Sequence, residues 1–402
     1  MSEDYLQSLM EYPEAIRAVV VIVPVFRSGS YLLSNLFDNH PEVLSVPPHA
    51  MHFFFHDIKQ WSDLVADKDV SIGDFKLFVE KRFEFLFREA DHVKRYSSAP
   101  PGTTMVAGVP RERFMAHFGD ILERLVDRDA ANVGNLFRAI HIAYAAAIPR
   151  RIESPAPIIV WQKHLPISDD EGALIRDSIG EATFLVTVRT PHVGFNAHYQ
   201  HFIENESTLF DHLPLRALRV NLHAMRRSRY PGPAYAVRFE DLHTRTEPLM
   251  RALARHLGIA WDPVLLKTTL DGETFYFPTA KGFITGTNPN VVQQRKTRYV
   301  SSLDIIRWRH GFAERYRDWG YALNRPAIET LLRFGLLRRL LFALPSRVEI
   351  NTLFRDIRGV FTLWLHTRRE LATLMANQGH LPAIPLLDLD APPADGGMGT
   401  DQ

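Results

Sequence analysis

A loop of sequence Arg-Ser-Gly-Ser, residues 27–30, carries groups that could bind an anion. It follows the β-branched run 19–25 and precedes a stretch whose leucines fall on one helical face. Glycine permits a tight backbone turn, arginine supplies a fixed positive charge, and the serines supply hydroxyl groups. A helix that begins directly after such a loop points its free N–H groups toward it. The pattern therefore predicts an anion site at the start of a helix over 30–37, with Ser30 as the helix N-cap.

A candidate proton acceptor follows a second apolar run, residues 158–161. Lys163 and His164 come shortly after this run. A neutral imidazole with a pKa of about 6.5 can take a proton from a hydroxyl group near neutral pH. His164 is therefore one candidate for a general base. The chain has 18 histidines, so the alternative is a histidine with a purely structural role.

Two basic stretches could bind a further anion. Arg189 follows the apolar run 183–188, and Arg295 and Lys296 lie in a later polar stretch. A planar guanidinium can hold a phosphate through two parallel hydrogen bonds. The alternatives are an ordinary arginine at a strand end and, for the later pair, a solvated basic loop.

An aromatic and histidine-rich stretch, HAMHFFFH at 49–56, follows another short apolar run. His52 and His56 are four residues apart, a spacing that could place two metal ligands on one helical face. No third ligand is apparent in the sequence, so we favour aromatic packing and a pocket wall over a metal site. We assign His49, His52, Phe53 and His56 to a substrate pocket.

The apolar runs predict the strands of a buried parallel sheet. Continuous apolar runs without alternation are typical of strands that are buried on both faces. They lie at 19–25, 158–161, 183–188 and 234–239, with helical patterns between them. Residues 57–150 also have mostly helical patterns. The expected fold is a three-layer α/β/α domain with a central parallel sheet.

Composition and missing motifs exclude several classes of protein. The chain has 402 residues, with 47 Lys and Arg against 46 Asp and Glu, and it has no cysteine. The balanced charge argues against nucleic acid as a partner. The lack of thiols excludes disulfide scaffolds, iron–sulfur clusters and thiol catalysis. No Gly-Lys pair occurs in the chain, so the Walker A loop of nucleotide-binding enzymes is absent.

Five segments, in order along the chain, resemble the sulfotransferases that use 3′-phosphoadenosine 5′-phosphosulfate (PAPS). Residues 23–41 (VPVFRSGSYLLSNLFDNHP) resemble the family's 5′-phosphosulfate loop. QKHLP at 162–166 is similar to the family's K-T-H-L-P, and LVTVRTPHVGFNAHYQHF at 185–202 is similar to its 3′-phosphate segment. VRFEDL at 237–242 is similar to V-R-Y-E-D-L, and Arg-Lys-Thr at 295–297 is similar to R-K-G. The resemblance covers about residues 18–322 and includes a P-loop-like fold.

The resemblance implies an enzyme that transfers a sulfuryl group from PAPS to an acceptor hydroxyl or amine and releases adenosine 3′,5′-bisphosphate. Arg27 would offset charge on the 5′-phosphosulfate. His164 would be the base, and Lys163 is an alternative charged partner of the transferred group. The residues implied in donor binding are Arg27, Ser28, Gly29, Ser30, Tyr31, Arg189, Asn196, Ala197, Phe239, Phe275, Arg295, Lys296 and Thr297.

The chain departs from the family pattern at positions that concern donor binding. Ala197 replaces a serine of the 3′-phosphate segment. Either a neighbour, Asn196 or His198, supplies the missing hydrogen-bond donor, or the affinity for PAPS is reduced. Phe239 replaces a tyrosine whose hydroxyl could touch adenine, and Phe275 is the candidate to stack on the adenine.

We predict a sulfotransferase-like domain over 1–325, in which 57–150 form the acceptor region. A helical extension over 326–380 and a disordered tail over 381–402 would follow. Residues 327–344 are strongly apolar and contain several arginines, which suits packing on the core or on a second subunit better than contact with a membrane surface. The start of the chain lacks the basic region of a secretory signal. We expect a cytoplasmic protein, with membrane association and a homodimer as open alternatives.

Two other functions fit parts of the sequence. A nucleotide-dependent kinase or NTPase would need the Walker lysine, which the loop lacks. A non-catalytic sulfotransferase-like module would explain the departures from the family pattern. The acceptor stays open between small molecules, lipids and glycans, because acceptor pockets are built from variable loops.

Overall fold

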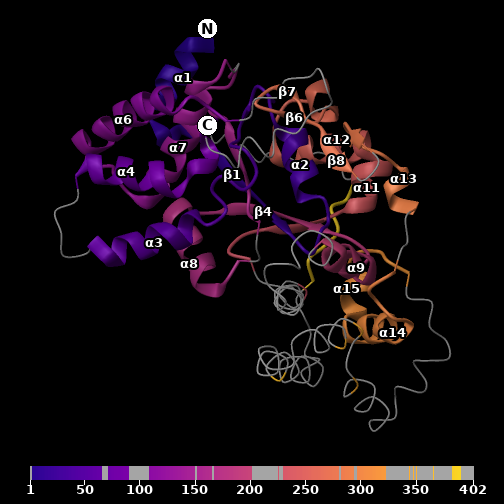
Figure 1. Ribbon diagram of the computed structural model, residues 1–402. Coiled ribbons are helices and arrows are strands. Elements are labelled where there is room, and N and C mark those ends of the chain that lie inside the picture. The colour runs from indigo at the N-terminus through magenta and orange to yellow at the C-terminus, as the bar shows by residue number, and fades with distance from the viewer. Residues whose placement is uncertain are drawn as a thin grey trace, which may run out of the picture.

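The computed structural model describes most of the chain around a central sheet (Figure 1). The described residues are 2–65, 71–89, 108–149, 152–164, 167–201, 230–279, 282–293, 297–322 and 383–390, with the single residues 225, 344, 347, 350 and 365. The predicted helical extension over 326–380, including the apolar stretch 327–344, lies outside these ranges apart from four of the single residues. Arg295 and Lys296 also lie outside the described residues.

Five parallel strands form the central sheet. They are β1 (Ala18–Pro24), β2 (Val43–Leu44), β3 (Ile158–Gln162), β4 (Ala182–Val188) and β5 (Ala234–Arg238). Their order across the sheet is β2-β3-β1-β4-β5. Val20 of β1 lies opposite Val160 of β3 on one side and Thr183 of β4 on the other. Because the strands are parallel, their carboxyl ends all lie at one edge of the sheet.

The side chains of β1 alternate between two hydrophobic cores. Val19, Val21 and Val23 point into a core shared with the helices between β2 and β3. Val20 and Ile22 point into a second core, shared with the helices α2 and α12. A continuous apolar run is thus buried on both faces, since successive residues of a strand point in opposite directions. The helices on both faces confirm the predicted α/β fold with a parallel sheet.

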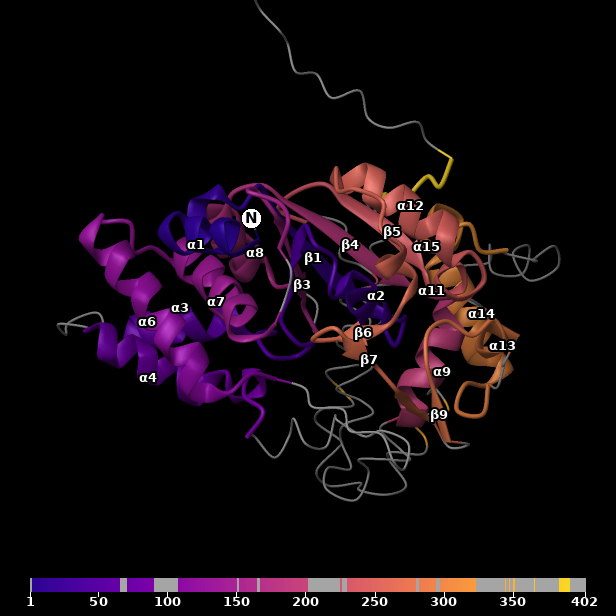
Figure 2. The same cartoon turned by 90° about the horizontal axis from the view of Figure 1, so that it is seen from above.

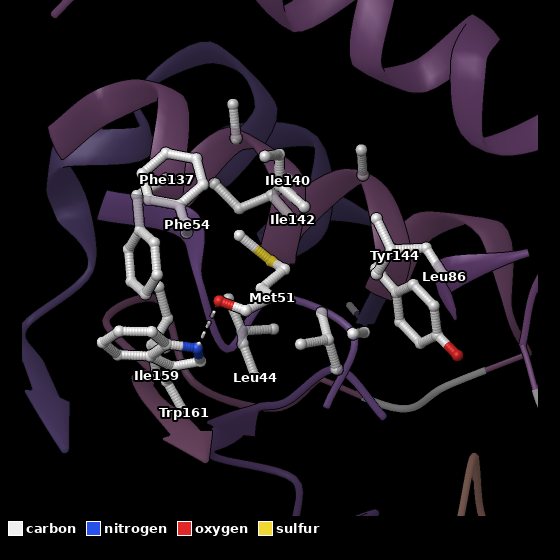
Figure 3. Packing of buried hydrophobic residues seen from close by; sticks show 14 of the residues in the cluster. Leu44, Met51, Phe54, Leu86, Phe137, Ile140, Ile142, Tyr144, Ile159 and Trp161 are labelled. Carbon is white, nitrogen blue, oxygen red and sulfur yellow. Dashed lines mark hydrogen bonds between the residues drawn. The ribbon is translucent and has the colours of Figure 1, made fainter. Parts of the chain in front are cut away.

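The first core is built around aromatic side chains at the centre of the helical region (Figure 3). Phe137 packs against Phe54 and Trp161, with ring centroids 5.3 and 5.4 Å apart. The helices of this side are α1 (Ser2–Glu11), α3 (Phe54–Val65), α4 (Ile72–Arg82), α6 (Arg111–Asp127) and α7 (Val133–Ala147), with 3₁₀ turns at Pro13–Ala15 and Glu84–Leu86. They form one lobe beside the sheet (Figure 2).

The remaining helices connect the strands and lie on both faces of the sheet, with α8 beside α3 and α7 of the first core and α2 and α12 in the second core. They are α2 (Ser30–Phe37), α8 (Asp169–Ile179), α9 (Pro191–His201), α11 (Phe239–Thr244), α12 (Thr246–Leu257), α13 (Asn290–Gln293), α14 (Ser302–Gly311) and α15 (Ala313–Asp318), with a 3₁₀ turn at Pro263–Leu266. Two small hairpins follow α12: β6 (Thr269–Leu270) with β7 (Glu273–Thr274), and β8 (Phe277–Thr279) with β9 (Gly282–Ile284). None of the helices in the described ranges has the length and hydrophobicity of a membrane span.

The predicted helix over 30–37 begins where expected, but its N-cap is Gly29 and not Ser30. Gly29 has φ +89°, a left-handed conformation that residues with a side chain rarely adopt. Because Gly29 takes the N-cap position, the N-cap lies one residue earlier than predicted. Ser30 is therefore the first helical residue, and its side chain is free to bond elsewhere than to the helix backbone.

The predicted disordered tail is wrong for residues 383–390. This segment lies along β5, where Ala236 donates to the carbonyl of Pro385 (2.8 Å) and accepts from the amide of Leu387 (3.0 Å). Ile384 and Leu387 are buried in two of the cores. The polar composition of the tail obscures these apolar side chains, and their binding site on the sheet edge exists only in the fold.

Leu387→Ala tests whether this segment stabilises the domain. Leu387 is 5% exposed, so we expect a loss of about 2–5 kcal/mol in the free energy of unfolding, the usual cost of such a truncation in a core. Urea denaturation of the full chain measures this loss. Leu77→Ala, at a position that is 47% exposed, is the matched control. An equal effect of the two substitutions would contradict a docked segment.

Candidate functional site

The described candidate residues gather at the carboxyl edge of the sheet. The loop 25–29 follows β1, His49 lies beyond β2, His164 follows β3, Arg189 follows β4 and Phe239 follows β5. The strand order places β3 and β2 on one side of β1, and β4 and β5 on the other. The loop therefore lies between histidines on one side and Arg189 with Phe239 on the other. Ligands of open parallel sheets bind at this edge.

The loop after β1 is held in an unusual backbone conformation at both ends. Phe26 has φ +62° and Gly29 has φ +89°. The Phe26 ring packs against Phe195, with ring centroids 4.5 Å apart, which stabilises this strained residue. At Gly29, an added Cβ atom would lie 3.1 Å from both Phe239 and Leu242. The loop thus approaches its neighbours so closely that glycine is required, while Arg27 is exposed.

The two serines of the loop have different partners. Ser28 is buried, and its hydroxyl donates to the Thr187 carbonyl at 2.7 Å and lies 2.9 Å from the Thr187 hydroxyl. Ser28 therefore fixes the loop to β4. Ser30 instead receives a hydrogen bond from the Gln162 side chain, at 3.2 Å.

Three histidines, His49, His52 and His164, form a cluster that we call the histidine group. The ring centroids of His49 and His164 are 4.2 Å apart, and the His52 ring is 5.9 Å from each of them. Burial lowers the pKa of His49 to about 2, and the charge of Arg27 and of the His164 and His52 imidazoles, when these are protonated, lowers it further. Burial also lowers the pKa of His52. At neutral pH His49 and His52 are therefore uncharged.

Phe275 lies at this end of the site. Its ring contacts Tyr31 and Phe277, with centroids 5.4 and 4.7 Å apart. Tyr31 in turn lies 5.4 Å from the His49 ring. These contacts place Phe275 in an aromatic row that ends at the histidine group, and its stacking on the adenine stays a prediction. The β6–β7 hairpin, which the sequence analysis missed, carries Phe275 to this position.

Lys163 is buried and has protein partners for its ammonium group. Its Nζ atom lies 2.9 Å from a carboxylate oxygen of Glu171 and donates to the His52 carbonyl at 2.8 Å. Burial lowers the pKa of Lys163, while the Glu171 carboxylate opposes this shift. These contacts make Lys163 an anchor for the histidine group, and its role as a charged partner of the transferred group stays a prediction.

Arg189 has a buried polar atom without a protein partner. Its guanidinium carbon lies 4.1 Å from the centroid of the Phe239 ring. Its Nε atom is buried and finds no hydrogen-bond partner among the described residues. Burial lowers the pKa of Arg189, and the nearby Glu240 opposes this effect. Since Glu240 itself accepts hydrogen bonds from Tyr321 (2.7 Å) and Thr190 (3.2 Å), an added anion would complete the bonding of Arg189.

The remaining described residues that were predicted to bind the donor lie in α9, shortly after Arg189, or in the segment before α14. Asn196 is buried in α9, and its side-chain oxygen accepts a hydrogen bond from the Tyr299 amide at 2.8 Å. Ala197 is half-buried next to it. Thr297 is half-buried, and its carbonyl accepts from the Val300 amide at 3.4 Å. The Asn196 oxygen thus joins α9 to the segment that follows the late basic pair.

The structure brings the predicted pocket residues together without forming a metal site. No group of three or more His, Asp or Glu side chains suited to a metal occurs in the described ranges. His56 is exposed and bonds to Gln60 at 3.0 Å. Phe53 packs against the His52 ring, with centroids 4.1 Å apart.

Two residues of the site were missed by sequence reasoning. Gln162 bonds to Ser30 and also accepts from the His49 amide at 3.3 Å. His243, in α11, has a pKa lowered to about 4 by burial and by the charge of Arg189. The position of Gln162 at the end of a buried strand was the only available signal for it.

His49→Asn tests the burial of an uncharged imidazole. The folded pKa of His49, about 2, lies below its unfolded value of 6.5, so its contribution to stability is complete above pH 6.5 and is lost as the pH falls. Each pH unit below this value costs about 1.4 kcal/mol, because only the unfolded chain takes up the proton. Between about pH 6 and pH 4, urea denaturation should show that the free energy of unfolding falls less steeply with decreasing pH in the variant than in the wild type. The difference should be about 1.4 kcal/mol per pH unit. Asparagine tolerates the positive φ of this position.

His56→Asn, at an exposed histidine, is the control for this experiment. The same pH dependence in the His49 variant and the wild type would contradict a neutral, buried His49.

Comparisons with known proteins identify the family of the chain. A family model described as "Sulfotransferase family" matches residues 19–263. Among solved structures, the chain is similar to "Sulfotransferase Domain from the Curacin Biosynthetic Pathway", with 15% identity, a TM-score of 0.34, and 77% of this chain and 93% of that chain covered. No curated protein matches the chain. The family match spans more than half of the sequence and includes the loop after β1, the histidine group and Arg189. The chain belongs to the sulfotransferase family.

Proposed function

We propose that the protein is a PAPS-dependent sulfotransferase that modifies a hydroxyl group, or less readily an amine, of a small-molecule, lipid or glycan acceptor. Membership of the family supports this proposal. The observation that carries it is the buried Nε atom of Arg189, which lies on the side of the loop opposite the histidine group and has no hydrogen-bond partner in the described part of the chain. A donor with anionic groups at both of its ends suits this arrangement.

The residues present fit such a donor. Helix α2 begins directly after Gly29, so the free N–H groups of its first turn point toward the loop. We assign the 5′ end of PAPS to the loop, with Arg27 and Ser30, and the 3′-phosphate to Arg189. Arg295, Lys296 and Thr297 are proposed as further contacts to the 3′-phosphate.

When bound, PAPS supplies a sulfuryl group whose bond to the 5′-phosphate breaks as the acceptor oxygen bonds to sulfur. Arg27 offsets the charge that develops on the phosphate oxygen. The imidazole of His164 takes the acceptor proton, as a side chain at the carboxyl edge of β3 next to the loop. His49 and His52 stay uncharged beside it, so they form a wall that does not repel a protonated His164.

Arg189→Ala tests the assignment of the 3′-phosphate. We expect the affinity for adenosine 3′,5′-bisphosphate to fall about 10- to 100-fold, the value of a charge-assisted hydrogen bond, while adenosine 5′-monophosphate is affected little. Isothermal titration calorimetry without added metal measures both affinities. Arg176→Ala, at a side chain that is 59% exposed, is the control.

ADP and ATP are titrated in the same series. If the wild type binds ATP more tightly than the bisphosphate, the PAPS assignment is wrong and a kinase-like function gains support. Equal losses for both adenosine ligands in the Arg189 variant would contradict a contact to the 3′-phosphate.

His164→Ala tests the base. The turnover number should fall by about 100-fold or more, the usual contribution of a general base, because the acceptor proton then has no receiving group. Release of adenosine 3′,5′-bisphosphate from PAPS is measured with a panel of acceptors comprising a phenol, a primary alcohol and a sugar. His117→Ala, in α6 on the far side of the helical lobe, is the control. Undiminished turnover in the His164 variant would exclude it as the base.

A further inference from the structure

The end of β3 holds the turn at residues 49–52 through consecutive side chains. Trp161 donates its indole N–H to the Met51 carbonyl at 3.2 Å, as Figure 3 shows. Gln162 accepts from the amide of His49 at 3.3 Å, and Lys163 donates to the carbonyl of His52 at 2.8 Å. The backbone that carries two of the three histidines is therefore fixed to β3 and not merely packed beside it.

Gln162 differs from its two neighbours because its side chain also reaches the loop after β1. The amide is buried, with 4% of the residue exposed. Its Nε2 atom lies 3.2 Å from the hydroxyl oxygen of Ser30, the first residue of α2. One side chain thus bonds to the turn of the histidine group and to the loop proposed to bind the donor.

The polarity of these bonds follows from the groups involved. The His49 backbone N–H can only donate, so the amide oxygen of Gln162 faces it and the amide nitrogen faces Ser30. An amide nitrogen can only donate, so the Ser30 oxygen is the acceptor in this pair. The hydroxyl hydrogen of Ser30 is therefore directed elsewhere, and no residue within the described ranges accepts it. Ser28, by contrast, already donates its hydroxyl hydrogen to the Thr187 carbonyl.

We infer that Gln162 is a positioning residue that orients the Ser30 hydroxyl toward the 5′ anionic end of the donor and fixes this end relative to the histidine group. The inference rests on the proposed function. It explains why the side chain at this buried position is an amide. A carboxylate could not donate to Ser30 and would place a negative charge next to a bound anion, and an aliphatic side chain could bond to neither partner.

Gln162→Met removes both hydrogen bonds while keeping the length of the side chain. We expect the affinity for adenosine 3′,5′-bisphosphate to fall about tenfold, whereas the affinity for adenosine 3′-monophosphate, which lacks the 5′-phosphate, stays within about twofold. Calorimetry measures both affinities. A merely structural role would weaken both ligands equally, and this result would overturn the inference. Gln60→Met, at an exposed glutamine of α3, is the matched control.

A double-mutant cycle with Ser30→Ala tests the route of the effect. If Gln162 acts through Ser30, Gln162→Met causes little further loss of bisphosphate affinity once Ser30 is alanine. Full additivity of the two losses would overturn this route. If thermal unfolding shows that Gln162→Met does not fold, Ser30→Ala is the deciding variant. A loss of affinity for the bisphosphate alone supports the inference. Equal affinities in this variant and the wild type overturn it.

The wild-type protein separates this inference from the proposed function. If the wild type binds neither adenosine ligand, the proposed function fails and the inference fails with it. If the wild type binds both ligands and Gln162→Met matches it for both, only the inference fails.

Discussion

The parallel arrangement of the strands is the constraint on which the rest of the site depends. Five strands in the order β2-β3-β1-β4-β5 bring five carboxyl ends to one edge. Residues far apart in the sequence, such as His49, His164 and Arg189, therefore meet around the loop after β1. The strand order also decides which side each residue takes: histidines lie on the β3 side and the arginine on the β4 side.

Burial gives these two sides opposite electrostatic characters. On the β3 side, desolvation and neighbouring positive charges keep His49 neutral, and the buried ammonium group of Lys163 is paired with Glu171. On the β4 side, Arg189 is half-buried, and its buried Nε atom has no hydrogen-bond partner among the described residues. A buried charge that lacks a full set of partners is costly unless a ligand supplies them. The loop between the two sides is strained at Phe26, a residue with a positive φ, as is typical of functional sites.

Much of the polar bonding around the site serves to position other groups. Ser28 bonds to β4 and Asn196 to the segment before α14, although the family resemblance implied that both bind the donor. Lys163 holds the turn of the histidine group. Their motif positions were predicted from the sequence, but the direction of each side chain was not, because a hydrogen bond goes to whichever partner the packed fold places within reach.

The sequence by itself determined the local features: four of the five strands, the strand–loop–helix unit at 18–37, the helical region after β2, and the family. These follow from continuous apolar runs and short motifs, which are local properties of the chain. Only the tertiary structure decided the place of Phe275 in the aromatic row, the docking of residues 383–390 on β5 and the double bonding of Gln162. Each of these depends on contacts between segments distant in the sequence, and a pattern read along the chain holds no information about which distant partner a side chain will meet.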